Sequence, residues 1–566
     1  MRARFSHGMV PGGFCLLLVL LAGSAAACAA GQALNFPEAR AIDELLMKAF
    51  KPDQPGAAAL VTRQGQTLLR KGYGLADMEL KVPIEPDMVF RLGSVTKQFT
   101  AVSILLLEEQ GKLSVGDPIT KFLPDYPTHG NTITIEHLLT HTSGIRSMTS
   151  MPEWPSQWRK DFTVGELINF FKDQPIDFVP DERWLYNNSG YLLLGAIIEK
   201  VSEQSYDAFL RKNIFEPLGM NHSYYDQTER IIPRRVKGYA RSAQGFQNAP
   251  YLSMTQPYAA GALASTVDDL ALWNAALWNN KLLKKETLAK AHTSYKLRNG
   301  QSTGYGYGWM IGSYAGHRTI EHGGGIHGFA TYELSLPEDG IFAVILTNGS
   351  ASPDLSPERL DLQMAAMALG KPVTEPKGIT LGIAQLDRVV GVYAGDDKHE
   401  RVITREGNQL YSQRSGGSRS AIHPLSETEF FFPNSQTRLV FFPDALGRIT
   451  QVELRPRVGM IESATRIEKA VGGRKEVNLD ATVLQRYVGV YELAPNFRLN
   501  VTLEEGKLMT QATGQPKVQI FPESESRFFL KVVDAQIEFI RDESGNAASL
   551  KLYQGGRITP ARKLKE

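Results

Sequence analysis

The chain has few cysteines, little net charge and few long apolar runs. Cys15 and Cys28 are its only cysteines among 566 residues, and both fall within the first thirty. The remainder cannot form disulfides, so its stability has to come from packed cores. The formal net charge is +2, and no run of lysine and arginine is long enough to form a basic stripe. We therefore do not expect nucleic acid as a partner.

One apolar run, Phe14 to Leu21, lies near the start and is too short to span a membrane. Arg2 and Arg4 precede it, and small residues from Ala22 to Ala30 follow it. A positive start, an apolar centre and a small-residue end are typical of a secretory signal peptide. We therefore predict that residues 1–30 are a signal peptide. The mature chain would have no transmembrane span and would be exported to a bacterial periplasm or secreted.

The end of this leader allows two kinds of processing. Plain cleavage near Ala29 or Ala30 is the predicted one. The alternative is lipid attachment at Cys28, because the three alanines before it loosely resemble a bacterial lipobox. That motif lacks its usual branched residue three places before the cysteine.

The length favours about two to four domains, and the first is expected over residues 37–370. Apolar side chains recur at helical spacing over 37–50 and 360–369, and helical patterns dominate from 94 to 292. Strand patterns occur at both ends of the region, at 57–62, 67–72, 306–311, 318–322, 329–336 and 341–347. The pattern predicts an α+β domain whose antiparallel sheet comes from both ends, with a helical insertion between them.

An internal repeat follows this domain. The segment Leu386 to Tyr393 resembles Leu484 to Tyr491, 98 residues later, and each copy continues in short strands with frequent turns. We predict two lipocalin-like antiparallel β-barrels over 380–470 and 480–566. Whether either barrel holds a ligand or is filled by its own side chains is left open.

Ser94 is the only serine in the chain that is followed three residues later by a lysine, Lys97. The apolar pattern after it predicts a helix that ends near Gly111, so Ser94 would lie at a helix start. Unpaired N–H groups and the positive dipole end stabilise negative charge there. Lys97, one turn later, would reach the serine oxygen from the same face. The alternative is a helix cap beside a solvated lysine.

Tyr186 and Asn188 form the second candidate motif, just before an apolar helix over 191–201. A nearby lysine ammonium would lower the pKa of the tyrosine, which could then accept the proton of Ser94. Asn188 has donors and an acceptor, so it could bridge Lys97 and a substrate carbonyl. The alternative is an ordinary helix-entry turn.

His322, Gly323, Gly324 and Gly325 form the third motif, after the strand pattern at 318–321. Glycine there would let a substrate lie against the strand edge. The N–H groups of Gly325 and Ser94 could then form an oxyanion hole. The alternative is a glycine-rich turn with a surface histidine.

Two other catalytic interpretations fail. His137 and His141 have zinc-ligand spacing, but Leu138 occupies the place of the catalytic glutamate, so both histidines are interpreted as structural. The sequence contains no Gly-x-Ser-x-Gly, so it lacks the nucleophile elbow of α/β-hydrolases.

The three motifs occur in one order within one domain, as in the serine β-lactamase and penicillin-binding protein superfamily, which the chain resembles over about 40–370. Supporting segments are 133–144, 261–266 and 305–309. The resemblance is to the class C-related branch. It implies these roles: Ser94 as nucleophile, Lys97 as its activating partner, Tyr186 as general base, Asn188 as positioning amide, and His322 and Gly324 on the strand that flanks the substrate.

One departure bears on the substrate. Class C β-lactamases have lysine where His322 stands, so the fixed charge that holds a β-lactam carboxylate is missing. Histidine there resembles esterases and D-aminopeptidases of the superfamily. The tandem barrels also resemble the three-domain D-aminopeptidases, in which a barrel loop restricts the site. Whether 532–536 or another loop does so here is left open.

The resemblance therefore implies an exported serine hydrolase, with no metal or organic cofactor, that cleaves small peptides or esters through an acyl-Ser94 intermediate. D-aminopeptidase, D-Ala carboxypeptidase and esterase are the expected types. A class C-like β-lactamase, or a penicillin-binding receptor without turnover, is the alternative. Lys97 rather than Tyr186 could be the base, and the oligomeric state is left open.

Overall fold

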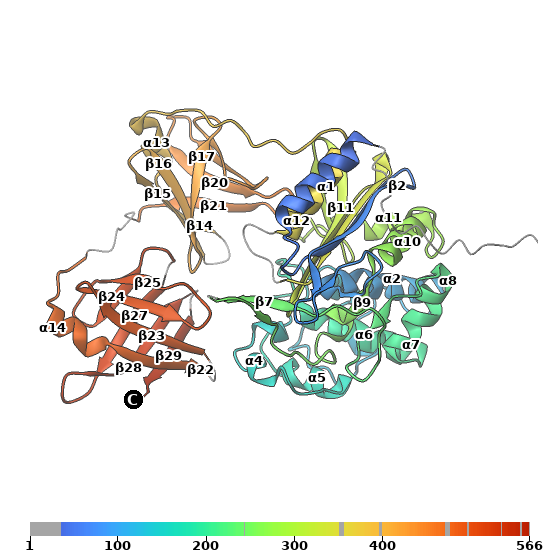
Figure 1. The fold of residues 1–566 in the computed structure, drawn as a ribbon, viewed down its shortest axis with the longest axis horizontal. Helices are drawn as coiled ribbons and strands as arrows, with labels where there is room; N and C mark the ends of the chain where they lie inside the picture. Colours follow the sequence, from blue (N-terminus) through green and yellow to red (C-terminus); the bar gives the residue numbers. More distant parts are fainter. Residues whose placement is uncertain are drawn as a thin grey trace, which may run out of the picture.

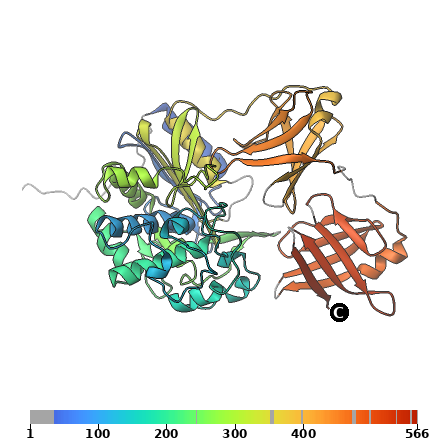
Figure 2. The same cartoon turned by 180° about the vertical axis from the view of Figure 1, so that it is seen from behind.

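The computed structural model describes residues 36–564 apart from 243, 350–355, 396–398, 470–475, 495–496, 534 and 555–556. Figures 1 and 2 show three units in chain order: a sheet-and-helix domain and two barrels. The expected fold class is confirmed. The expected signal peptide and Cys28 lie outside the described residues.

The first unit is built on a six-stranded antiparallel sheet in the order β10-β11-β12-β13-β1-β2. Its strands are β1 (Ala57–Arg63), β2 (Gln66–Tyr73), β10 (Met310–Tyr314), β11 (His317–Ile326), β12 (Phe329–Leu336) and β13 (Ile341–Thr347). Both ends of the region thus meet in one sheet, because β1 pairs with β13 along its whole length. The last two strands coincide with their predicted ranges.

The strand predicted at 306–311 is wrong in its position. Residues 307–309 form bends, and β10 begins only at Met310. The amide of Gly306 donates to the carbonyl of Trp309, and that of Tyr307 donates to Ala291. These turn and helix contacts use the backbone groups that a strand ladder would need.

Helices cover both faces of the sheet (Figure 1). On one face lie α1 (Pro37–Ala49) and α12 (Pro357–Ala368), which pack on alternate residues of β1 such as Ala57 and Ala59. On the other face Ala58 and Leu60 join the core of the helical region. This alternation follows from the two-residue repeat of a strand.

The helical region between β2 and β10 also contains short strands, which the sequence did not indicate. Its helices are α2 (Thr96–Glu109), α3 (Ile135–Leu139), α4 (Trp154–Gln157), α5 (Val164–Phe171), α6 (Asn188–Ser202), α7 (Tyr206–Leu210), α8 (Glu216–Leu218), α9 (Tyr258–Gly261), α10 (Val267–Trp278) and α11 (Lys285–Ala291). The short strands are β3 (Leu75–Asp77), β4 (Val82–Pro83), β5 (Phe90–Arg91), β6 (Tyr224–Tyr225), β7 (Tyr239–Ser242), β8 (Gly245–Asn248) and β9 (Leu263–Ser265).

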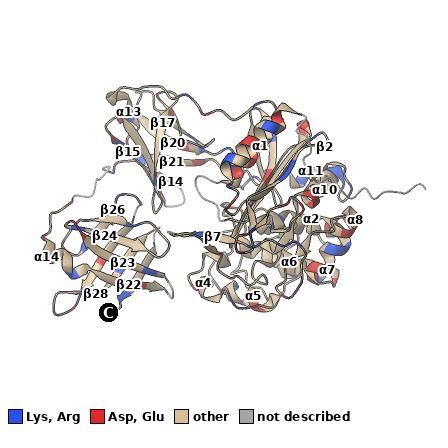
Figure 3. Cartoon of the chain, in the orientation of Figure 1, with Lys and Arg blue, Asp and Glu red and all other residues tan. Residues whose placement is uncertain are grey.

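Single turns complete this unit: η1 (Gly93–Val95), η2 (Ile119–Lys121), η3 (Met148–Ser150), the π-turn η4 (Arg211–Phe215) and η5 (Pro337–Asp339). None of the helices in the described ranges is long and apolar enough to cross a membrane. Figure 3 shows basic and acidic residues interspersed along the backbone of all three units.

Each copy of the repeat forms a closed eight-stranded antiparallel barrel. The first follows α13 (Ile383–Val389) and has β14 (Gly391–Gly395), β15 (Glu400–Glu406), β16 (Gln409–Arg414), β17 (Arg419–Pro424), β18 (Glu429–Phe431), β19 (Arg438–Pro443), β20 (Ile449–Arg455) and β21 (Glu462–Ile467). The second follows α14 (Ala481–Leu484) and η6 (Gln485–Tyr487) and has β22 (Gly489–Ala494), β23 (Phe497–Glu504), β24 (Lys507–Ala512), β25 (Val518–Pro522), β26 (Arg527–Leu530), β27 (Ala535–Arg541), β28 (Ala547–Gln554) and β29 (Arg557–Lys563).

The two barrels repeat each other down to their cores. Tyr393, Phe430 and Phe441 pack as a group of rings in the first barrel, and Tyr491, Phe528 and Phe539 do so at equivalent positions in the second. Both tyrosines donate a 2.8 Å hydrogen bond to the carbonyl four residues earlier. These rings and their buried apolar neighbours occupy the barrel interiors, which favours the packed alternative over a ligand site.

The first barrel contacts the sheet directly. The segment between β20 and β21 lies against the edge strand β10, where Val458 forms an antiparallel bridge with Gly312. Arg457 of this segment is 6% exposed and its guanidinium donates to both carboxylate oxygens of the fully buried Glu321, at 2.6 and 2.5 Å. In the second barrel, Val533 forms a bridge with Ser418 of the first. That loop of the second barrel therefore lies against its neighbour.

Candidate active site

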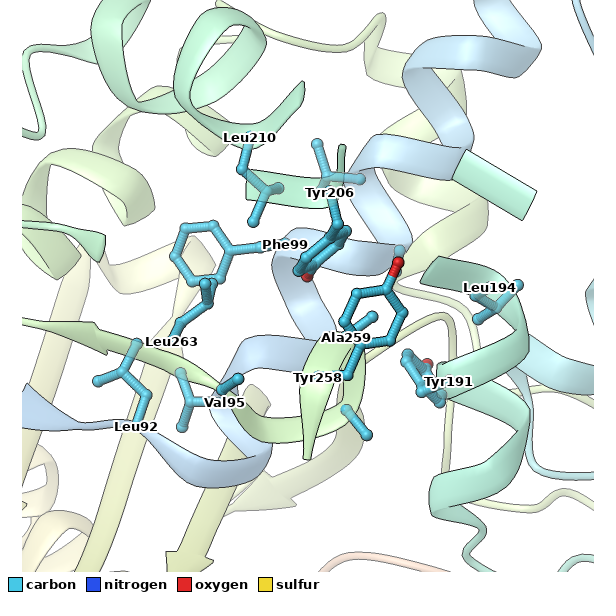
Figure 4. Packing of buried hydrophobic residues seen from close by; sticks show 14 of the residues in the cluster. Leu92, Val95, Phe99, Tyr191, Leu194, Tyr206, Leu210, Tyr258, Ala259 and Leu263 are labelled. Atoms are coloured by element: carbon cyan, nitrogen blue, oxygen red, sulfur yellow. The ribbon is translucent and has the colours of Figure 1, made fainter. Parts of the chain in front are cut away.

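Ser94 lies at the start of a buried helix. The single turn η1 runs into α2, and the preceding residue Leu92 is fixed by a 2.8 Å hydrogen bond from its amide to the carbonyl of Leu263. Figure 4 shows Val95 and Phe99 in the surrounding apolar core. Packing on both sides of Ser94 holds its backbone in one position, as an attacking group requires.

The Lys97 amine is completely buried and lies among three oxygen atoms. Its Nζ is 3.1 Å from the Ser94 Oγ, 2.8 Å from the Asn188 Oδ1 and 2.9 Å from the carbonyl oxygen of Ala260. No carboxylate pairs with it among the described residues. Burial therefore lowers the pKa of the Lys97 amine well below its ordinary value.

This arrangement suits a neutral amine, which has two N–H bonds and one lone pair. The amide oxygen of Asn188 and the carbonyl of Ala260 can only accept hydrogen bonds, so they take the two N–H bonds. The lone pair is then left to face the hydroxyl of Ser94. Lys97 is thereby poised to accept a proton.

Tyr186 is buried beside the same amine, with the Lys97 Nζ 4.8 Å from the centre of its ring. Its hydroxyl has no hydrogen-bond partner of ordinary geometry among the described side chains and backbone. Burial raises the pKa of Tyr186, and the nearby Ser94 hydroxyl opposes this only in part. The expected lowering of the Tyr186 pKa by a Lys97 ammonium is therefore wrong, because burial of the phenol is the dominant effect and raises that pKa.

Asn188 begins α6, and both the oxygen and the nitrogen of its side-chain amide have a partner. Its Oδ1 accepts from Lys97, while its Nδ2 donates to the Thr149 hydroxyl at 3.0 Å. Asn187 caps the helix by accepting the amide of Gly190 at 2.9 Å. The cap fixes where α6 starts and so places Asn188 against Lys97.

His322 does not face the pocket at Ser94. Its ring is 1% exposed, with Nδ1 2.6 Å from the carbonyl of Gly323 and Nε2 2.9 Å from the Tyr305 hydroxyl. Burial lowers the pKa of His322 to about 3, and the Lys97 side chain acts in the same direction. The ring is thus neutral, and both of its nitrogens are used within the protein. The expected contact between His322 and a substrate is not present in this arrangement.

The glycines after His322 continue strand β11 to Ile326, so the strand is longer than predicted. A Cβ on Gly324 would lie 1.9 Å from the carbonyl oxygen of Leu92, so glycine is needed there to let η1 approach the strand. Glycine is therefore required at position 324 by the close packing of η1 on β11, and not by a need for space for the substrate. A Cβ on Gly325 would meet nothing within 4 Å, and Gly325 lines the pocket in front of Ser94.

That pocket has a volume of about 370 Å³. Of the predicted site residues, Ser94, Asn188 and Gly325 line it, whereas Lys97 and Tyr186 lie behind Ser94. Ligand pockets of this size are typical for small molecules. The arrangement offers a hydroxyl at the pocket wall, a base behind it and a strand edge beside it.

The two histidines with zinc-ligand spacing each accept a backbone hydrogen bond. The Nδ1 of His137 accepts from Thr134 at 3.2 Å, and the Nδ1 of His141 accepts from Asn187 at 3.1 Å. Across the described residues no group of three histidine, cysteine or acidic side chains could hold a metal ion.

Sequence reasoning missed three groups at this site. The carbonyl of Ala260 carries no side-chain signal, although the flanking segment 261–266 was recognised. Thr149 lies in a turn, η3, without a motif of its own. Tyr305 was noted as part of 305–309, but only its 2.9 Å contact with His322 shows what its hydroxyl does.

Comparisons with known proteins agree with this geometry. The family model described as "Beta-lactamase" matches residues 39–368, and one described as "Domain of unknown function (DUF3471)" matches 473–566. The chain is 30% identical to penicillin-binding protein 4* of Bacillus subtilis over 405 residues, which cover 67% of this chain and 88% of that protein.

Two solved structures are also similar. The octameric penicillin-binding protein homologue from Pyrococcus abyssi matches with a TM-score of 0.54 and 28% identity, over 75% of this chain and 99% of its own. The D-amino acid amidase from Ochrobactrum anthropi SV3 matches with a TM-score of 0.53 and 25% identity, over 59% of this chain and 99% of its own. Taken with the fold and the Ser94 site, these matches show that the chain belongs to the beta-lactamase and penicillin-binding protein family of serine hydrolases.

Proposed function

We propose that this protein hydrolyses amide or ester bonds through an acyl-Ser94 intermediate. The observation that carries the proposal is the buried Lys97 amine, which lies 3.1 Å from the Ser94 Oγ and is held by two groups that can only accept. A serine hydroxyl is a weak nucleophile and needs an adjacent base to attack a carbonyl. Lys97 supplies that base.

In the proposed reaction the Ser94 Oγ attacks the substrate carbonyl carbon while its proton passes to the Lys97 amine. The N–H groups of Ser94 and Gly325 stabilise the negative oxygen that develops. The tetrahedral intermediate collapses as the bond to the leaving group breaks, and that group takes a proton from the Tyr186 hydroxyl or from Lys97. Water then attacks the acyl-serine, and the reverse proton transfers restore Ser94.

The name of one similar protein, a D-amino acid amidase, supports amides among the substrates, whereas the names of the penicillin-binding proteins point to a β-lactam as a ligand. Residue 322 is histidine, whereas class C β-lactamases have a lysine at this position whose charge holds the β-lactam carboxylate. This difference favours peptides and esters over β-lactams as substrates. D-aminopeptidase, D-Ala carboxypeptidase and esterase activity are all compatible with the site. The alternatives are a β-lactamase and a receptor that is acylated without turnover, and the test must distinguish both from a peptidase or an esterase.

The purified protein should turn over p-nitrophenyl acetate, D-alanine p-nitroanilide or both, faster than nitrocefin. Ser94→Ala should lower the rate by at least about a thousandfold, because the nucleophile is lost and only binding and the oxyanion hole remain. Release of p-nitrophenol or p-nitroaniline gives the rate, and mass spectrometry of the intact protein detects an acyl adduct.

A stable adduct on Ser94 without turnover would favour the receptor. Rapid turnover of nitrocefin alone would favour the β-lactamase. If Ser94→Ala kept the rate of the parent protein, or if no serine-directed probe labelled Ser94, the proposal would be refuted.

We also infer export, from the charge and apolar pattern of residues 1–30. Expression of the full chain in a Gram-negative bacterium should give a periplasmic or secreted product. Mass spectrometry of its N-terminal peptide should find a start near Ala29 or Ala30, or a lipid on Cys28. An uncleaved product that starts at Met1 and stays in the cytoplasm would contradict export.

A further inference from the structure

The pocket in front of Ser94 has mostly apolar walls. Met148, Leu192 and Leu252 are almost fully buried and form part of its lining, together with the rings of Trp154 and Pro257. None of its described lining residues is aspartate, glutamate, lysine or arginine. Its volume of about 370 Å³ would hold about a dozen water molecules at about 30 Å³ each.

The polar side chains in the wall are largely used within the protein. Gln256 is completely buried: its Oε1 accepts from the indole of Trp154 at 2.9 Å, and its Nε2 donates to the carbonyls of Gln157 and Lys160. Trp154 therefore presents its ring, not its N–H, to the pocket. Asn188 is engaged by Lys97 and Thr149.

Among the described lining residues His327 is the one titratable ring, and it is neutral. Its Nδ1 lies 3.0 Å from the carbonyl of Pro250, which can only accept, so this nitrogen carries the proton. The ring also packs edge-on against Trp158 at 4.3 Å. Burial lowers the pKa of His327, and no carboxylate among the described residues pairs with it. The described residues that line the pocket thus offer no charge to a carboxylate or to an ammonium group.

We propose that this pocket binds the acyl side chain of the substrate, and that the acyl group is uncharged and apolar, of medium alkyl length or aromatic. The proposal rests on the proposed acyl-Ser94 reaction and narrows it to esters and acylated peptides, because a D-aminopeptidase substrate carries a free α-ammonium on the acyl group that the described pocket lining does not pair. A substrate acyl group with a free carboxylate or a free α-ammonium would have to shed its hydration without finding a partner. An apolar chain would instead gain from every group it buries against Met148, Leu252 and the Trp154 ring.

The test is a series of p-nitrophenyl esters with acetate, butyrate, hexanoate and octanoate as acyl groups. The value of kcat/KM should rise about fourfold for each added CH2 until the pocket is full. Two esters of matched length end in a charge: the adipate monoester in a carboxylate and 6-aminohexanoate in an ammonium. Each should react at least about a hundredfold more slowly than hexanoate. Equal rates for hexanoate and either charged ester would overturn the proposal.

A substitution in the pocket wall tests whether this wall causes the preference for uncharged acyl groups. Leu252→Lys places a cation there and should raise the ratio of adipate-monoester to hexanoate kcat/KM at least about tenfold over that of the volume-conserving control Leu252→Met. Labelling of Ser94 by a fluorophosphonate probe shows that each variant is folded. An unchanged ratio in a labelled Leu252→Lys protein would show that the acyl group lies elsewhere.

The outcomes also separate this proposal from the proposed function. No hydrolysis of any ester and no labelling of Ser94 in the parent protein would refute both. Hydrolysis of the acetate ester that depends on Ser94, with no dependence on chain length, would refute only the assignment of the pocket.

Discussion

Replacing Lys97 with methionine should lower kcat/KM for p-nitrophenyl acetate by about a thousandfold, within the range expected for loss of a positioned general base. Methionine fills a similar volume but cannot accept the proton of Ser94. The base would be missing while the pocket and the strand edge beside it remain. Initial rates of p-nitrophenol release measure the effect, and thermal unfolding checks that the variant is folded.

Two further variants identify the base. Lys97→Arg should be as inactive as Lys97→Met, because a guanidinium stays protonated and cannot accept a proton. Tyr186→Phe should keep more activity than either, since burial keeps the phenol of Tyr186 protonated. The opposite order, with Tyr186→Phe the most damaging change and Lys97→Met mild, would make Tyr186 the base.

The pH profile gives an independent check of the same prediction. Activity requires the neutral amine, so kcat/KM should rise as the pH rises through the pKa of Lys97. Burial lowers that pKa well below its ordinary value, so the plateau should begin well below pH 10. A rate that is still rising at pH 10 would indicate a base with an unshifted lysine pKa or a phenolate.

Replacing Arg457 with methionine should destabilise the catalytic domain by about 3–5 kcal/mol, although Arg457 belongs to the first barrel. It is the guanidinium that pairs with both oxygens of Glu321, which is fully buried next to His322 in β11. Without it a buried carboxylate would be left uncompensated. Unfolding in urea followed by tryptophan fluorescence measures the effect, because all six tryptophans lie within 154–309, in the catalytic domain.

Two controls distinguish this effect from the loss of a surface charge. Arg455→Met removes a guanidinium that is 45% exposed and pairs with Glu453 on the same barrel, and it should cost only about 0–1 kcal/mol. The double variant Arg457→Met with Glu321→Gln should recover much of the lost stability, since no charge is then buried alone. If Arg457→Met and Arg455→Met lowered the free energy of unfolding equally, the ion pair of Arg457 with Glu321 would not stabilise the sheet.

Local patterns were sufficient for much of the fold. The strand-type residue patterns at 329–336 and 341–347 predicted β12 and β13, and the repeated segment predicted two barrels, because both signals can be recognised in the sequence without knowing the fold. The range 306–311 was misplaced for the opposite reason. Within it the amide of Tyr307 donates to the carbonyl of Ala291, which lies sixteen residues earlier, and no local pattern indicates that bond.

By itself the sequence determined that Ser94 and Lys97 share one face of a helix start, because residues three apart are neighbours on any helix. Only the tertiary structure decided that this lysine is buried without a carboxylate, and so can be a base. It also decided that His322 turns to Tyr305 rather than to the pocket, and that Arg457 of another domain pairs with Glu321. Burial and partner choice depend on segments far apart in the chain that meet only when it folds, so residue spacing alone does not contain them.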